Sequence, residues 1–281
     1  MRDGRHTAAL TECDKALEGD CPKRERFALL QLKAQALVIT DGKWTGPAMS
    51  CLKEAMTLTE PGSQERGQVF AAQTAGYAGM GCLGPCLRAR NDFVTLYEAR
   101  PTPLLAKLYP DVEYNLALAY HEVDRIDEAE STYLIALGAA RKSDDPYVRS
   151  LLPVLHHNLV DIFQEVDRFE HAKLIMDKWY RELPEDTYGA QMRNRRAIQD
   201  LHEGDLTSAL LWAESGLGHK SCDVRTRAAL TLTKAKILEA GGQADEAHDI
   251  CLEALRLAAL AKSPRLSHRV SSFIQELSKG V

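Results

Sequence analysis

A turn residue that returns about every forty positions constrains the fold of this chain more than any other feature. Successive copies lie 37 to 43 residues apart, and five residues after each copy stands alanine in six cases and Pro47 in the seventh. Glycine reaches positive φ without steric cost and aspartate tolerates it, so such residues suit tight turns between helices. The seven expected turn residues are Gly4, Gly42, Gly84, Asp124, Asp167, Gly204 and Gly242.

Apolar residues between these turns recur with the 3.6-residue period of helices, which predicts an all-α chain built from antiparallel helix hairpins. Repeated hairpins bury their apolar faces by stacking on their neighbours, so we expect a single solenoid over residues 1–281. A last helix without a partner follows Pro264 and is expected to cap the array. The expected units lie near 1–20, 22–60, 65–100, 104–144, 147–184, 187–220 and 223–263, with the cap at 264–281.

Composition excludes several classes of protein. Of the 281 residues 45% are hydrophobic and only 6% aromatic, and the net charge is −5 without any Lys/Arg run, which argues against direct nucleic-acid binding by this segment. No apolar run is long enough to span a bilayer, and the N-terminus lacks the apolar core of a signal peptide. Seven cysteines without a compact framework suggest reduced thiols, and hence a cytoplasmic protein.

Three segments carry a resemblance to a known family. Asn115-Leu-x-x-Ala-Tyr120 with Asp127-Glu-Ala129 is close to the tetratricopeptide (TPR) consensus, and Gly204-Asp-Leu and Gly242-Gln-Ala-Asp-Glu-Ala247 match its turn. The resemblance covers about the whole chain and implies a right-handed superhelical solenoid. The period exceeds the usual 34 residues because the helices are longer. In helix length and inner-face polarity the chain resembles the peptide-sensing domains of bacterial Rap, PlcR and NprR regulators.

The first expected unit contains only the second helix of a hairpin. An array that starts in mid-repeat leaves an apolar face unpaired, so we expect the sequence to be a fragment, to have an alternative start, or to be the sensor half of a longer protein whose N-terminal domain is missing here. In the regulators named above, a DNA-binding helix-turn-helix or a helical bundle precedes the repeats. Any DNA-binding role is therefore expected to lie in residues before Met1.

No motif supports an enzyme, a metal site or a bound cofactor. Gly79-Met-Gly81-Cys-Leu-Gly84 spells a dinucleotide fingerprint but follows a helical pattern rather than a strand, so its glycines are expected to permit close packing or a bend. Cys82 and Cys86 have poor spacing for zinc, although a redox pair stays open. His156 and His157 are adjacent and cannot share a metal from one helix face. We therefore expect no catalytic residue, no metal ligand and no cofactor.

The inner face of the solenoid is the expected binding surface, because the first helix of each hairpin lines it. Asparagine offers both a donor and an acceptor and can pair with an extended peptide backbone, and arginine can hold a carboxylate. The generic alternative is that asparagine recurs here in the TPR consensus whatever the partner. Counting back from the turns gives the expected peptide-binding stripe: Tyr114, Asn115, His157, Asn158, Asp161, Asn194, Arg195 and Lys236, extended by His121, Gln164 and His202.

The matching positions of the second and third units are Leu32, Lys33 and Ala36, then Thr74, Ala75 and Ala78. They predict a smoother and more apolar stretch. It could receive an apolar ligand segment, contact a second subunit as a homodimer, or pack against a missing domain.

Two functions compete. The first is a sensor domain of a bacterial regulator that binds a short peptide in its groove and relays a conformational change, with a role in quorum sensing and transcriptional regulation implied by the resemblance. The alternative is a constitutive protein–protein scaffold or chaperone-type adaptor without ligand gating. Both predict that the partner is a short peptide or an extended protein segment, with no nucleic acid and no membrane involved.

Overall fold

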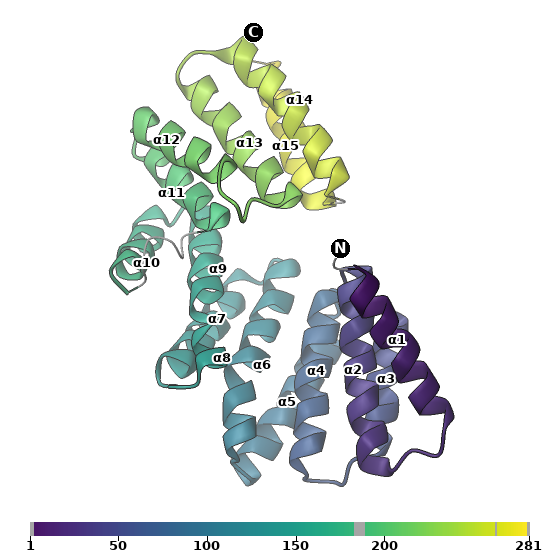
Figure 1. Cartoon of the computed structure of the whole chain (residues 1–281). Coiled ribbons are helices and arrows are strands. Elements are labelled where there is room, and N and C mark those ends of the chain that lie inside the picture. Colours follow the sequence, from purple (N-terminus) through teal and green to yellow (C-terminus); the bar gives the residue numbers. More distant parts are fainter. Residues whose placement is uncertain (1–2, 183–188, 262, 280–281) are drawn as a thin grey trace. The chain divides into compact units, whose positions relative to one another are not determined.

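The computed structural model describes residues 3–182, 189–261 and 263–279, and within them every regular element is an α-helix. Consecutive helices form antiparallel hairpins (Figure 1), as the 3.6-residue period predicted. The helices are α1 (Asp3–Glu18), α2 (Lys23–Asp41), α3 (Gly46–Thr57), α4 (Gln64–Gly79), α5 (Leu83–Ala99), α6 (Pro103–Glu122), α7 (Ile126–Arg141), α8 (Pro146–Arg149), α9 (Leu152–Glu165), α10 (Phe169–Glu182), α11 (Ala190–His202), α12 (Leu206–Leu217), α13 (Val224–Ala240), α14 (Ala244–Leu260) and α15 (Pro264–Leu277).

Local sequence explains where many helices begin. The side chains of Ser63 and Thr102 accept hydrogen bonds from backbone N–H groups of α4 and α6, and Asp205 and Asp223 do the same for α12 and α13. Such caps satisfy N–H groups that have no partner inside the helix. Proline stands in the first turn of α3, α6, α8 and α15, where its missing N–H costs nothing.

Five hairpin turns share one backbone geometry. Each has a residue at positive φ, and the N–H of the next residue donates to the carbonyl five positions back, as in Arg125 to Tyr120 at 3.0 Å. This is the Schellman closure of a helix by a left-handed residue. Five residues after each left-handed residue lies a fully buried small side chain, which lets the hairpin helices approach closely. The left-handed residues are Gly81, Asp124, Asp167, Gly204 and Gly242, and the small residues are Cys86, Ala129, Ala172, Ala209 and Ala247.

Two of the expected turn residues are wrong. Gly84 lies inside α5, and the turn before that helix is made by Gly81 at φ 69°, so the repeat register of the third unit starts three residues earlier. Gly4 lies in the first turn of α1. Gly42, at φ 66°, is the left-handed residue that ends α2, in agreement with the sequence.

The neighbouring glycines of α4 have a packing role. A Cβ atom on Gly79 would lie 2.6 Å from the Trp44 ring, and one on Gly76 would lie 2.3 Å from the sulfur of Met49. Glycine is therefore required where α4 meets Trp44 and α3. Of the three glycines that resemble a dinucleotide-binding motif, Gly79 therefore permits close helix packing, Gly81 makes the turn and Gly84 lies in α5.

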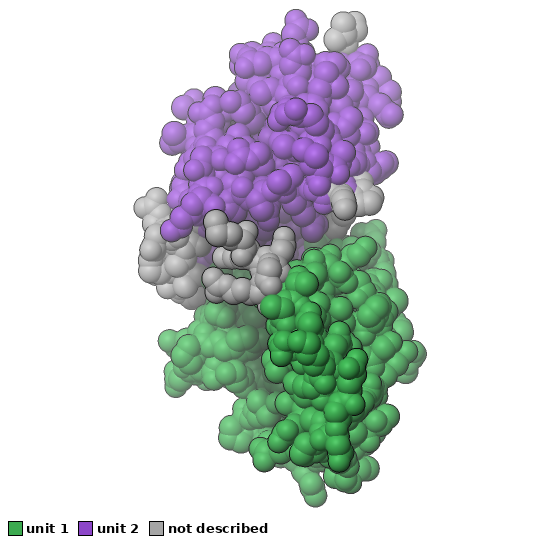
Figure 2. All heavy atoms as spheres, turned by 45° about the vertical axis from the view of Figure 1, so that its right-hand side comes forward, with its two compact units in different colours: residues 1–155 green, residues 156–281 purple. Residues whose placement is uncertain are grey.

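The chain divides into two compact units, residues 1–155 and 156–281 (Figure 2). In the first unit α4 packs against both α5 and α6, around Ala71, Phe93 and Leu105. In the second unit α15 packs against α14 and α13 through Leu266 and Val270. The boundary falls within α9. The continuity of one solenoid across both units, and the unit limits expected from the sequence, stay predictions.

No described helix is both long and apolar enough to cross a membrane. The seven cysteine thiols are free, and Cys86 is fully buried with its Sγ 3.6 Å from the Thr74 carbonyl oxygen. Burial raises the pKa of Cys86 to about 12, which opposes formation of a reactive thiolate.

Candidate functional site

A cavity of about 350 Å³ lies in the second unit. Its lining comes from the first helices of successive hairpins, namely the end of α9, then α11 and α13, with further residues from α10 and α15. Four residues of the predicted stripe meet here: Gln164, Asn194, Arg195 and Lys236. His202, expected to extend the stripe, lines the same cavity.

A buried hydrogen bond joins α11 to α13 at this cavity. The hydroxyl oxygen of Thr233 lies 2.7 Å from Oδ1 of Asn194, and both side chains are buried. This bond uses the acceptor of the Asn194 side chain and fixes its orientation. Thr233 stands in the register position that Asn115 and Asn158 hold in their own units, ten residues before the end of the turn. In this unit the residue at that register position, Thr233, therefore orients Asn194, and Asn194 is the stronger candidate for contact with a ligand.

Gln164 and Arg195 connect α9 to α11. Nε2 of Gln164 donates to the backbone carbonyl of Arg195 at 2.9 Å, and Nη1 of Arg195 lies 2.6 Å from Oδ1 of Asp161. Both Gln164 and Arg195 are buried. Oε1 of Gln164 and Nε of Arg195 are buried without a hydrogen-bond partner in the described residues. A buried polar atom without a partner is costly, which makes these two atoms candidates for a ligand contact.

His157 belongs to the same cluster but behaves as a neutral base. Its Nδ1 is buried without a hydrogen-bond partner among described residues. Burial, and then the nearby guanidinium of Arg195, lower the pKa of His157 to about 4, whereas Asp161 acts in the opposite direction. The imidazole is therefore uncharged near neutral pH. Asp161 pairs with Arg195, and neither His157 nor Asp161 is among the described residues that line the cavity.

Lys236 brings a positive charge to the cavity lining, which also includes the carboxylates of Glu165 and Asp167. Lys236 is half-buried and makes no hydrogen bond or ion pair within the described part of the chain. Its ammonium lies 5.4 Å from the centre of the Phe273 ring. Burial, and then the positive charge of Arg269, lower the pKa of Lys236, while Glu276 and Cys251 partly offset this. An anion in the cavity would restore the favourable environment that Lys236 lacks.

Apolar side chains complete the walls of the cavity. Ile198 and Leu201 contribute from α11, and Leu232 and Leu266 from α13 and α15. The rings of Phe169 and His202 stack nearly parallel, with centroids 3.6 Å apart, at the side formed by α10 and α11. The cavity thus combines a few polar groups with apolar surface, which is the usual composition of a ligand site.

The predicted residues of the first unit do not show free ligand-binding groups. Nδ2 of Asn115 donates to the carbonyl of Asp111 at 2.7 Å, one turn back in α6. Tyr114 packs against Tyr133 of α7, with ring centroids 6.2 Å apart, and His121 is buried. In the second unit Asn158 is half-exposed on α9 and is not among the described residues that line the cavity. Whether these four residues contact a ligand stays a prediction.

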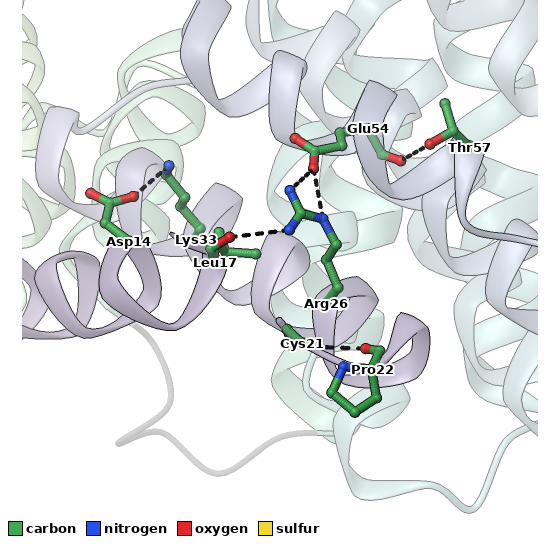
Figure 3. A network of polar contacts seen from close by, with 8 residues as sticks. All are labelled: Asp14, Leu17, Cys21, Pro22, Arg26, Lys33, Glu54 and Thr57. Carbon is green, nitrogen blue, oxygen red and sulfur yellow. Dashed lines mark hydrogen bonds and ion pairs between the residues drawn. The ribbon is translucent and has the colours of Figure 1, made fainter. Parts of the chain in front are cut away.

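The first unit has its own cavity, of about 590 Å³, over α2 between α1 and α3. Figure 3 shows its charged groups paired across the helices. Nζ of Lys33 lies 2.5 Å from Oδ1 of Asp14, and Nη2 of Arg26 lies 2.6 Å from Oε1 of Glu54. Arg26 also donates to the carbonyl of Leu17 at 3.1 Å. Lys33, expected on a smoother and more apolar stretch of the inner face, thus has its ammonium bound to Asp14 of α1, and the character of that stretch stays a prediction.

Several cavity residues were not singled out from the sequence as site residues. Thr233 could have been found, because it occupies the register position of Asn115. Phe169 lies two residues after the Asp167 turn, outside the first helices that were searched. Leu266 and Arg269 come from α15, which has no place in the repeat register. Among the described residues no group of three or more His, Cys, Asp or Glu is arranged to hold a metal ion.

No protein-family model matches the chain, and no curated protein matches it in sequence. Solved structures do resemble it. The apo form of RapI matches with a TM-score of 0.59 at 12% identity, over 90% of this chain and 97% of RapI. PilW, a widely conserved type IV pilus biogenesis factor, matches with a TM-score of 0.57 at 13% identity, over 87% of this chain and 97% of PilW.

BtubC (BKLC) from P. vanneervenii matches with a TM-score of 0.50 at 14% identity, over 92% of each chain. At such low identities the likeness concerns the fold alone. The chain is a TPR-like, all-α helical repeat protein, as its turns and helix pairs indicated.

Proposed function

We propose that this chain is a protein-interaction module whose second unit binds an extended peptide, or an extended segment of a partner protein, in the cavity at α9, α11 and α13. The observation that carries the proposal is the convergence of Gln164, Asn194, Arg195 and Lys236, from three successive first helices, on one cavity. Side-chain amides can donate to and accept from a peptide backbone whatever its side chains are. Apolar walls beside them can hold a ligand side chain.

The charges favour a ligand with a carboxylate. Lys236 has no hydrogen-bonded or ion-paired partner within the described residues, and Nε of Arg195 is also unused. A carboxylate placed between them would gain charge-assisted hydrogen bonds in a partly dry site. Asp161 of α9 pairs with Nη1 of Arg195 on α11. A ligand that binds the Arg195 guanidinium therefore competes with this contact between the two helices.

This competition gives the sensor form of the proposal a physical basis. A ligand that changed the contact between Asp161 and Arg195 would alter how α9 packs on α11, which a regulator could relay to a partner or to a dimer. The likeness to RapI and PilW concerns the fold and does not choose between this form and a constitutive scaffold. A quorum-sensing peptide, a transcriptional output and a cytoplasmic homodimer belong to the sensor form and stay predictions.

The proposal can be tested by selecting peptides from a displayed random library against the whole chain and measuring their affinities by calorimetry. We expect Asn194→Ala and Lys236→Met each to weaken binding by about tenfold or more, since each removes about one charge-assisted or buried hydrogen bond. Lys234→Met is the matched control for Lys236→Met, because Lys234 is paired with Glu214 and does not line the cavity. Selected peptides that bind Asn194→Ala and Lys236→Met as tightly as wild type would refute the site.

Hydrogen exchange separates the two forms of the function. The sensor form expects a bound peptide to change exchange in α9 and α11, including amides remote from the cavity. The scaffold form expects protection only next to the ligand. In either case the Asp161→Asn variant should bind peptide at least as well as wild type, because Arg195 is released for the ligand.

A further inference from the structure

Lys236 differs from other lysines of this protein whose charges have close neighbours. Lys234, two residues away on α13, lies 3.0 Å from Oε1 of Glu214, and Lys173 lies 3.0 Å from Oε1 of Glu203. Lys33 is paired with Asp14. Each of these carboxylates accepts the ammonium group of its lysine. Lys236 instead lines a cavity with apolar walls, without an acceptor for its ammonium in the described residues.

The groups around Lys236 favour its neutral amine. Burial lowers the pKa of Lys236, and the nearby guanidinium of Arg269, on α15, lowers it further. Glu276 of α15 and Cys251 of α14 oppose this less strongly, and Phe273 offers only a ring face. A lysine that is desolvated beside a second cation is the usual arrangement of a nucleophilic amine. Each unit by which the pKa is lowered raises the neutral fraction near neutral pH about tenfold.

The same neighbours define what such an amine could accept. Arg269 and Lys236 both line the cavity, so an electrophile that carries an anionic group can place the anion on the guanidinium while its reactive carbon meets Nζ. The cavity volume of about 350 Å³ accommodates a small organic molecule. Anions without a reactive carbon would bind reversibly at this position.

We propose that Lys236 is a covalent attachment site for small aldehydes that carry a phosphate or carboxylate group. The neutral Nζ attacks the carbonyl carbon and forms a C–N bond. The two amine protons pass to the carbonyl oxygen, which leaves as water, and a C=N bond remains. No oxidant or reductant is required. The adduct removes the positive charge of Lys236 from the peptide cavity, so it would also regulate ligand binding there, although attachment itself does not depend on peptide binding.

The test uses pyridoxal 5′-phosphate as the anionic aldehyde and pyridoxal, which lacks the phosphate, as its matched control. The whole chain is exposed to each at low concentration, the imine is reduced with borohydride, and modified lysines are mapped by mass spectrometry. We expect Lys236 to be labelled severalfold faster than Lys234, because Lys234 is paired with Glu214 whereas Lys236 lines the cavity beside Arg269, and we expect the phosphate to increase the rate at Lys236. Equal labelling of Lys236 and Lys234, or equal rates with both aldehydes, would overturn the proposal.

Three variants identify which residues make Lys236 react faster than Lys234 and make it prefer the aldehyde that carries a phosphate. Lys236→Arg should abolish the fast reaction, whereas Lys234→Arg should leave it unchanged. Arg269→Gln should reduce the ratio of the two aldehyde rates, which isolates recognition of the anion from any change in amine basicity. A ratio unchanged by Arg269→Gln contradicts the assigned anion site. Because the mapping is done first on the wild-type chain, a variant that fails to fold does not affect the main result.

Discussion

The cavities of the two units differ in how their charges are satisfied. Over α2 in the first unit, Lys33 and Arg26 both face carboxylates, and Arg26 also holds a backbone carbonyl of α1 (Figure 3). In the second unit, Lys236 has no such partner in the described residues, and one buried polar atom each of Gln164 and Arg195 is unused. The two cations of α2 thus fasten neighbouring helices, whereas at the second cavity Arg195 pairs with Asp161 through Nη1 but leaves Nε unused, and Lys236 stays available to a ligand. The incomplete pairing marks the second cavity as the better candidate for function.

The largest expected effect concerns a buried pair in the first unit. Nη2 of Arg90 lies 2.6 Å from Oε1 of Glu113, and the Glu113 side chain is almost completely buried. Glu113→Ala removes the buried carboxylate that accepts from Nε and Nη2 of the partly buried Arg90 guanidinium, so we expect it to lower the free energy of unfolding by about 3 kcal/mol. Denaturant unfolding measures this loss. The Arg90→Leu, Glu113→Leu double variant should recover much of it, and a loss from Glu113→Ala well under 1 kcal/mol would show that charge pairing does not hold this unit together.

The second expected effect is acid sensitivity of the second unit. The pKa of His157 is lowered from its ordinary 6.5 to about 4, so the unfolded chain binds a proton at a higher pH than the folded chain does. Stability from neutral His157 is therefore complete above about pH 6.5 and is lost as the pH falls towards 4, by roughly 3 kcal/mol in total.

Hydrogen exchange of α9 and α11 as a function of pH measures this effect. His157→Gln should flatten the dependence, because glutamine has no proton to gain. A His157→Gln variant with the same acid sensitivity as wild type would exclude His157 as the cause.

A smaller effect is expected at the bond between α11 and α13. Thr233→Val keeps the side-chain shape but removes the hydroxyl that lies 2.7 Å from Oδ1 of Asn194. We expect a loss of about 1 kcal/mol in the stability of the second unit, the usual net value of such a bond. Peptide affinity should fall as well, since the Asn194 amide loses its fixed orientation. Val69→Ala, in the core of the first unit, controls for general loss of stability and should leave peptide affinity unchanged.

The smallest effect is expected for the half-exposed pairs over α2. Lys33→Met removes the contact with Asp14, whose side chain is half-exposed, and solvent screening limits its value to less than about 1 kcal/mol. The Asp14 hydrogen bond is the main cause of the raised pKa of Lys33. Unfolding of wild type and Lys33→Met should therefore differ little near neutral pH. A loss of several kcal/mol would mean that the docking of α1 depends on this pair.

Much of the fold could be predicted because it follows from backbone geometry. Gly42, Asp124, Asp167, Gly204 and Gly242 adopt positive φ, and only a few residue types do so at low cost. The error at Gly84 has a specific cause. Gly81 and Gly84 both precede apolar helical positions, so the sequence offers either as the turn residue. Gly81 makes the turn because the N–H of the next residue, Cys82, donates to the Tyr77 carbonyl and closes α4.

The site could be predicted only in part. Counting back from the turns placed Gln164, Asn194, Arg195 and Lys236 at the inner positions, and these four do line one cavity. The same count treated Asn115 as their equivalent, although its amide bonds to Asp111 in its own helix. Register specifies the helix face of a residue, whereas its rotamer and neighbours specify whether its polar atoms are free.

From the sequence alone, the period near forty residues and the small residues after each turn determined an array of helix hairpins, because turn conformation and helix approach are short-range properties of the chain. The tertiary structure alone decided that Arg269 lines the same cavity as Lys236, that the Thr233 hydroxyl donates to the Asn194 side chain, and that Lys33 is bound to α1. These facts depend on which side chains from distant segments meet. Pairing of charges is a property of that assembly, which no single repeat encodes.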